Sequence, residues 1–210
     1  MFDTAIISDR IIMPDGIKRA IVLIKDGIIA DIVGELPVGN FPVLDLGNKV
    51  LMPGVVDPHV HINEPGRTDW EGFDTATKAA IAGGITTLVD MPLNSSPVTT
   101  TAGAFDVKVN ATKTKLHTKC GFWGGLVPGN ENEIEPLIDK GVLGFKAFLT
   151  HSGIDEFPNV TEDDLRKAMP VIEKYRLPLL VHCELSFPLP WRGVGAGAYK
   201  NYLASRPKKW

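Results

Sequence analysis

Two of the chain's five histidines, His59 and His61, lie one residue apart at the end of the apolar run VLMPGVVDPHVH. In a β-strand, residues i and i+2 point to the same side, so we expect both imidazoles to face the same way. Two neutral imidazoles on one side supply half of a typical zinc site. The alternative is a pair of histidines in a surface loop.

Two further polar residues interrupt or end apolar runs. His182 ends LPLLVH, where a lone histidine is often a polar strand cap. Lys146 lies inside VLGFKAFL, and an unpaired ammonium is costly to bury. Such a lysine pairs with a carboxylate at the sheet edge, has a lowered pKa, or is modified. A neutral amine reacts with carbon dioxide to form a carbamate, an anion that can bridge two cations. Two ions about 3.5–4 Å apart share a hydroxide and polarise a carbonyl, which is chemistry for amide hydrolysis.

The elements that must position these residues alternate between strand and helix after Leu51. The strands are near-continuous apolar runs, which is typical of a parallel sheet buried on both faces, either open or closed into a barrel. The predicted helices cover residues 70–84, 101–117, 132–141 and 161–176. Functional residues of such folds gather where strands end, and the polar residues at these ends are His59, His61, Asp90, Lys146 and His182.

Residues 1–50 have a different pattern. Short β-branched runs alternate with turn residues, and Asp15-Gly16 and Asp26-Gly27 are strong hairpin signals. We therefore predict two parts, a small β-sandwich-like segment over residues 1–50 and a partial (β/α) barrel over residues 51–210.

Composition excludes several classes of function. The chain has 210 residues and a formal net charge of -3, so it lacks the basic surface of a nucleic-acid-binding protein. No apolar run approaches the length of a membrane span, and the first residues do not form a secretory signal, so we expect no membrane contact and a cytoplasmic location. Cys120 and Cys183 are expected to be reduced core residues.

The motifs PGVVDPHVH, GFKAFL and LLVHCE resemble the amidohydrolase superfamily, and within it the cyclic amidohydrolases. The segments HINEPGRTDWEGF, DMPLNSSPVTT and GFWGGLVPGN are similar to those of the allantoinases. The resemblance covers roughly residues 5–210 and is most specific over 50–184. It implies a small β-rich domain followed by a metal-dependent TIM-like (β/α) barrel, two divalent ions, usually zinc, and a homo-tetramer. The implied activity is hydrolysis of allantoin, a small molecule, to allantoate in purine breakdown.

The resemblance also implies roles for individual residues. His59 and His61 would bind one metal ion, Lys146 in its carbamylated form would bridge both ions, and His182 would bind the second. Asp57 would orient a histidine from outside the ligand set, or it is simply a turn residue.

Asn63 and Asn94 are the candidate substrate-binding residues. In the related dihydroorotases, an arginine two positions after the H-x-H pair binds a substrate carboxylate, whereas this chain has the neutral Asn63. A neutral ring rich in amides needs hydrogen bonds rather than a counter-charge. The alternative is that both asparagines cap loops. Three readings of the function stay open: allantoin hydrolysis, another cyclic amidohydrolase (a dihydropyrimidinase or dihydroorotase), or a non-catalytic relative with a structural or interaction role.

The chain departs from the family pattern after His182. The family requires a further histidine and a late aspartate, and no histidine follows His182 and no aspartate follows Asp164. No catalytic residue is therefore assigned within the chain. About five of the eight strand units of a closed barrel are present. We expect a C-terminally truncated form, whether through a gene model, splicing or a partial sequence, and the 210 residues alone to be inactive or weakly active.

Overall fold

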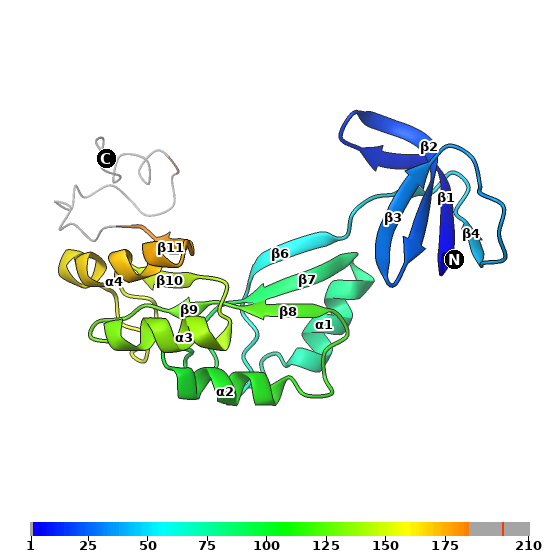
Figure 1. The fold of residues 1–210 in the computed structure, drawn as a ribbon. Coiled ribbons are helices and arrows are strands. Elements are labelled where there is room, and N and C mark those ends of the chain that lie inside the picture. Colours follow the sequence, from blue (N-terminus) through cyan, green and yellow to red (C-terminus); the bar gives the residue numbers. More distant parts are fainter. Residues whose placement is uncertain (1, 185–198, 200–210) are drawn as a thin grey trace. The chain divides into compact units, whose positions relative to one another are not determined.

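The computed structural model describes residues 2–184 and 199 (Figure 1). The chain forms two compact units, one of Met1–Val56 with Gly84–Thr86 and one of Asp57–Gly83 with Thr87–Trp210. The sequence-based division after residue 50 stays a prediction. None of the helices in the described part has the length and apolar character needed to span a bilayer.

The first unit is a five-stranded sheet in the order β3-β2-β1-β4, with β5 also pairing with β1. Its strands are β1 Thr4–Met13, β2 Gly16–Lys25, β3 Ile28–Val33, β4 Val43–Asp45 and β5 Val50–Leu51. Both predicted hairpins are confirmed. Met13 pairs with Gly16 across the first turn. In the second, Asp26 and Gly27 have φ values of 53° and 71°, the two positive angles that a type I′ turn requires.

Two three-stranded sheets, β6-β7-β8 and β9-β10-β11, lie mainly in the second unit, although the first two residues of β6 and of β7 belong to the first. The strands are β6 Val55–Val60, β7 Ile85–Asp90, β8 Lys119–Phe122, β9 Gly124–Gly125, β10 Phe145–Phe148 and β11 Leu179–His182. The pairs β7–β8, β9–β10 and β10–β11 are parallel. Within each sheet, neighbouring strands are also consecutive along the chain. Only Trp123 separates β8, the last strand of one sheet, from β9, the first strand of the other. The described residues therefore form an incomplete (β/α) barrel, as the sequence predicted.

Four helices connect these strands in the described region: α1 Phe73–Ala82, α2 Ala102–Ala111, α3 Ile134–Lys140 and α4 Glu162–Lys174. In the view of Figure 1, α2 and α3 lie below strands β8 and β9, whereas α1 runs beside β7 and β8. Helix α4 begins as predicted at the N-cap Thr161, which forms a capping box with Asp164. Helix α2 is shorter than predicted. The chain leaves the helix after Ala111, and Thr114 has a φ of 64°.

One hydrophobic core cluster among the described residues of the second unit lies near the strand ends. It contains Val89, Met91, Leu93, Trp123, Phe148 and Phe157. The two cysteines are free, as expected, but their predicted burial is only partly right. Cys120 is half-buried and Cys183 is exposed, because β11 ends at His182 and Cys183 follows it.

Candidate metal centre at the strand ends

The two histidines of the H-x-H motif lie side by side. His59 belongs to β6 and His61 follows directly after its last residue, Val60. Their ring centroids are 5.3 Å apart and the ring planes are inclined by 53°. Asp57 accepts a hydrogen bond from the backbone N–H of His59 at 3.1 Å. This contact of Asp57 is therefore with the backbone of the motif, as in a turn.

The surroundings of His61 favour its neutral form. Partial burial is the main factor that lowers the pKa of His61, and the nearby charges of His59, Lys108 and Lys146 lower it further. A hydrogen bond with the backbone of Leu93 acts in the opposite direction. The neutral imidazole is the form that binds metal ions.

Lys146 is buried in the middle of an apolar strand. Its exposed fraction is 5%, and its neighbours Phe145 and Ala147 are fully buried. The amine lies 4.8 Å from the centroid of the Phe148 ring. No carboxylate in residues 2–184 forms an ion pair with it. Burial lowers the pKa of Lys146, although Cys183 opposes this shift.

His182 is connected to this lysine through Phe148. Phe148 and His182 are register partners on the parallel strands β10 and β11. Their rings stack with centroids 5.1 Å apart and an interplanar angle of 19°. The imidazole of His182 also lies 3.9 Å from the carboxylate of Glu184. Phe148 therefore contacts both Lys146 and His182.

The side chains around the H-x-H pair supply only part of a metal site by themselves. Within residues 2–184, histidine, cysteine, aspartate and glutamate side chains form no group of three that could hold an ion. Lys146, however, is close enough to His61 for its charge to affect the imidazole. A carbamate on Lys146 would add oxygen donors to the two imidazoles, and mixed nitrogen and oxygen donors suit zinc and similar ions. The residues present therefore fit a metal centre that includes a modified Lys146.

The two candidate substrate residues lie on neighbouring loops that share one contact residue, Arg67. The backbone N–H of Arg67 donates to the carbonyl of Asn63 at 3.0 Å. Its guanidinium donates to the carbonyl of Asn94 at 2.9 Å. Asn94 has a φ of 75°, a left-handed conformation that asparagine tolerates better than most residues. These contacts use backbone carbonyls and leave both side-chain amides for other partners.

Arg67 also connects to a third loop. Its guanidinium forms an ion pair with Glu156 at 3.2 Å and lies 5.5 Å from the centroid of the Trp70 ring. The loops after β6, β7 and β10 thus meet at one side chain. No local pattern assigned a role to Arg67, because its partner Glu156 lies 89 positions away.

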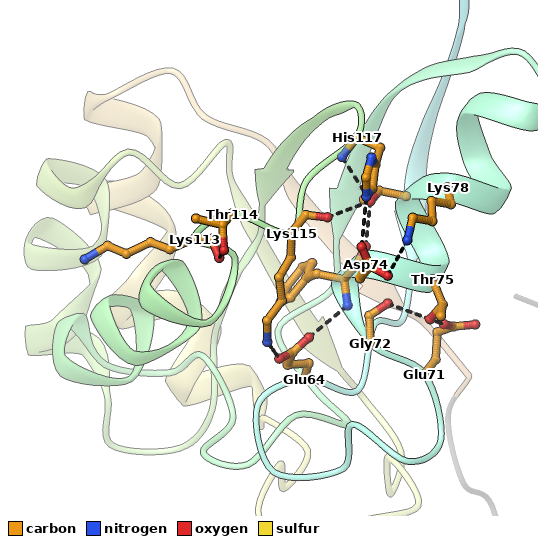
Figure 2. A network of polar contacts seen from close by, with 12 residues as sticks. Glu64, Glu71, Gly72, Asp74, Thr75, Lys78, Lys113, Thr114, Lys115 and His117 are labelled. Carbon is orange, nitrogen blue, oxygen red and sulfur yellow. Dashed lines mark hydrogen bonds and ion pairs between the residues drawn. The ribbon is translucent and has the colours of Figure 1, made fainter.

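Glu64, which follows Asn63 directly, holds the loop after β6 to the helical layer. Its carboxylate accepts a hydrogen bond from the backbone N–H of Phe73, at the start of α1, at 2.9 Å. The other oxygen pairs with Lys115, which faces Glu64 in Figure 2. Figure 2 also shows Asp74, which pairs with Lys78 at 2.7 Å and with His117 at 2.8 Å. The network fixes this loop but contributes no group to the histidine pair.

An ion pair that is buried on both sides lies next to the H-x-H motif. The Lys108 amine is 2.6 Å from the carboxylate of Asp90, and both side chains are almost completely buried. Burial raises the pKa of Asp90 to about 6, whereas Lys108 and the backbone N–H groups of Ile62 and Met91 act to lower it. The sequence placed Asp90 at a strand end but gave no sign that Lys108 was its partner.

Comparisons with known proteins identify the family of this chain. The model of the amidohydrolase family matches residues 50–187. An allantoinase of Streptomyces avermitilis is 49% identical over 207 residues, which are 96% of this chain and 46% of that protein. An allantoinase of Arabidopsis thaliana is 44% identical over 97% of this chain and 42% of its own length. The chain thus spans less than half the length of these relatives.

The fold of this chain is also similar to that of a solved structure. The L-hydantoinase (dihydropyrimidinase) of Arthrobacter aurescens superposes with a TM-score of 0.82 and 35% identity. The superposition covers 89% of this chain and 42% of that one. The match of the family model over most of the barrel region shows that the chain belongs to the amidohydrolase family.

Proposed function

We propose that the protein containing this chain hydrolyses the ring amide of allantoin to give allantoate. The observation that carries the proposal is the buried Lys146, which has no ion-pair partner in residues 2–184. Its charge acts on His61, and the Phe148 ring that it contacts stacks on His182. The allantoinases of Streptomyces and Arabidopsis support this choice of substrate. In the reaction, water adds to a ring carbonyl carbon and the ring C–N bond breaks, which leaves a carboxylate and a ureido nitrogen.

In this proposal His59 and His61 would hold one divalent ion and His182 would hold a second. Lys146, in its carbamylated form, would bridge the two ions. Zinc is the preferred metal because imidazole and carboxylate-like oxygen donors suit it. When bound, the ions supply a water of lowered pKa and polarise the substrate carbonyl. Burial of Lys146 favours its neutral amine, which is the form that can react with carbon dioxide.

Asn63 and Asn94 are proposed to orient the substrate ring. Both lie on loops that Arg67 contacts, and their amide side chains can donate and accept hydrogen bonds. A substrate with a carboxylate would lack a counter-charge at Asn63. The alternative substrates are the hydantoins or dihydropyrimidines of the Arthrobacter protein, whose rings also carry amides but whose substituents differ.

The experiment uses the protein purified from its natural source, so that any chain that accompanies these 210 residues is retained. It would be supplied with zinc and bicarbonate and assayed on allantoin, hydantoin, dihydrouracil and dihydroorotate. We expect allantoin to have the highest kcat/KM. Preference for hydantoin or dihydrouracil would favour the alternative substrates, and equal activity on dihydroorotate would refute the role of Asn63. A folded, metal-loaded protein without activity on any ring would favour the non-catalytic reading.

Two broader expectations belong to the same proposal. The resemblance to cyclic amidohydrolases suggests a homo-tetramer, which sedimentation of the same preparation would test. The cytoplasmic location stays a prediction that cell fractionation would test. Elemental analysis would identify the metal, and a mass increase of 44 Da on Lys146, about that of carbon dioxide, would identify the carbamate.

A further inference from the structure

The backbone beside His61 lies outside the regular sheet. Strand β6 ends at Val60 and strand β7 ends at Asp90. The last backbone contact between them is the hydrogen bond from the N–H of Met91 to the carbonyl of Val60, at 2.8 Å. After Val60, the backbone no longer pairs with the backbone of β7, and a side chain of β7 accepts its hydrogen bond instead. The carboxylate of Asp90 accepts the N–H of Ile62, the residue after His61, at 2.7 Å.

This carboxylate is itself held in place. The Lys108 amine of helix α2 donates to Asp90 at 2.6 Å and to the carbonyl of Met91 at 3.0 Å. Asp90 is 0% exposed and Lys108 is 1% exposed. A continuous set of contacts therefore runs from α2 through Lys108 and Asp90 to the backbone of Ile62. On the other side of the motif, the Trp123 indole donates to the carbonyl of Pro58 at 2.8 Å.

Stability alone is a weak reason for such a pair. Replacing a buried ion pair by apolar residues of similar volume is often neutral or stabilising, because removing both charges from water is costly. The contacts of the Asp90–Lys108 pair indicate a more specific role. The pair fixes the peptide N–H directly after His61, where no strand partner is left. Groups that orient metal ligands typically change metal affinity by about 10–100-fold when they are lost.

We propose that Asp90, held by Lys108, is a positioning residue that fixes the backbone after His61 and so orients this imidazole toward a metal ion. The inference rests on the proposed metal centre and adds a requirement to it. The orientation of His61 depends on the hydrogen bond that Asp90 accepts from the N–H of Ile62. The charges of Asp90 and Lys108 are needed only to keep this acceptor in place.

Two double variants separate the hydrogen bond from the charges. Asp90→Asn with Lys108→Met removes both charges but keeps a carbonyl oxygen for the N–H of Ile62. Asp90→Leu with Lys108→Met removes the acceptor as well, with almost the same side-chain volume. Thr77→Val is the control, because it deletes a buried hydroxyl that has no contact with the motif. This hydroxyl donates to the carbonyls of Phe73 at 2.6 Å and Lys115 at 3.3 Å, and it accepts from the N–H of His117 at 3.2 Å.

Each protein would be titrated with Co²⁺ as the probe, with the visible spectrum as readout and urea unfolding of the metal-free form as a measure of stability. We expect the Asn variant and the Thr77 control to bind Co²⁺ within about threefold of wild type, and the Leu variant to bind about 10–100-fold more weakly. Wild-type affinity in the folded Leu variant would overturn the inference, as would an equal loss in both double variants. A wild-type protein that binds no Co²⁺ would refute the metal centre itself and, with it, this inference.

A second measurement does not depend on the Leu variant being folded. Hydrogen exchange of the Ile62 amide would be followed in wild type and in the Asn variant. Slow exchange in both is expected, because each keeps the acceptor. Exchange in wild type as fast as that of exposed loop amides would overturn the proposal.

Discussion

The two buried lysines should respond in opposite directions to the same substitution. Lys146 and Lys108 are both almost completely buried. Lys108 has a carboxylate partner at 2.6 Å, whereas Lys146 has an aromatic ring at 4.8 Å and no ion-pair partner in residues 2–184. We predict that Lys146→Met stabilises the metal-free protein and abolishes the bridged metal centre, whereas Lys108→Met destabilises the protein.

The surroundings of each lysine determine how much its replacement changes the free energy of unfolding. Burying a polar group without a partner costs about 1–3 kcal/mol, and methionine fills a similar volume without a polar atom. Loss of the contact between Lys146 and the Phe148 ring offsets about 0.5–1 kcal/mol of this gain. Lys146→Met should therefore raise the free energy of unfolding by about 0–2.5 kcal/mol. Lys108→Met leaves the Asp90 carboxylate buried without its partner, which should cost about 3–5 kcal/mol.

Both variants would be unfolded in urea, in a buffer with chelator and without bicarbonate, so that neither metal nor carbamate contributes to stability. Metal content would then be measured after dialysis against zinc and bicarbonate. A Lys146→Met protein that is less stable than wild type without metal would refute the reasoning about its unpaired amine. Retention of two zinc ions in that variant would refute the bridging role.

Three further outcomes are expected. Asn63→Arg should raise the KM for allantoin about tenfold, because a cation replaces an amide that can both donate and accept; an unchanged KM in steady-state assays would contradict this. Arg67→Met should also raise KM, with zinc content unchanged and partial recovery in Arg67→Lys, because the loop of Asn94 loses its charged donor. Thr161→Ala should lower the free energy of unfolding by about 0.5–2 kcal/mol through loss of the helix cap. Hydrogen bonds from Thr161 hold the pKa of Asp164 below its usual 3.8, so this stabilisation is present above pH 3.8 and is lost as the pH falls through the lowered pKa. Urea unfolding between pH 2 and 7 should therefore show a shallower acid dependence in Thr161→Ala than in wild type.

Local patterns in the sequence were sufficient for the secondary structure and for much of the order of the elements. Asp26-Gly27 predicted the hairpin because those residue types tolerate positive φ values, and Thr161 predicted the start of α4 because its hydroxyl can cap backbone N–H groups. The alternation of apolar strands with helices predicted the parallel barrel strands. The end of α2 at Ala111 was missed, because the polar residues that follow have no strong breaker among them.

In the candidate site, too, local spacing predicted some features and only the fold determined others. The H-x-H spacing predicted two adjacent imidazoles from the two-residue period of a strand. The near-continuous apolar run around Lys146 predicted a buried amine, because such a run is typical of a strand that is buried on both faces. Only the tertiary structure decided which groups meet across the chain: Asp90 with Lys108, Trp123 with Pro58, and Arg67 with Glu156. These pairings depend on how helices and loops close over the strand ends, and no local spacing encodes such a contact. The exposure of Cys183 was decided in the same way, because its burial depends on what packs beyond the end of β11 rather than on the apolar run before it.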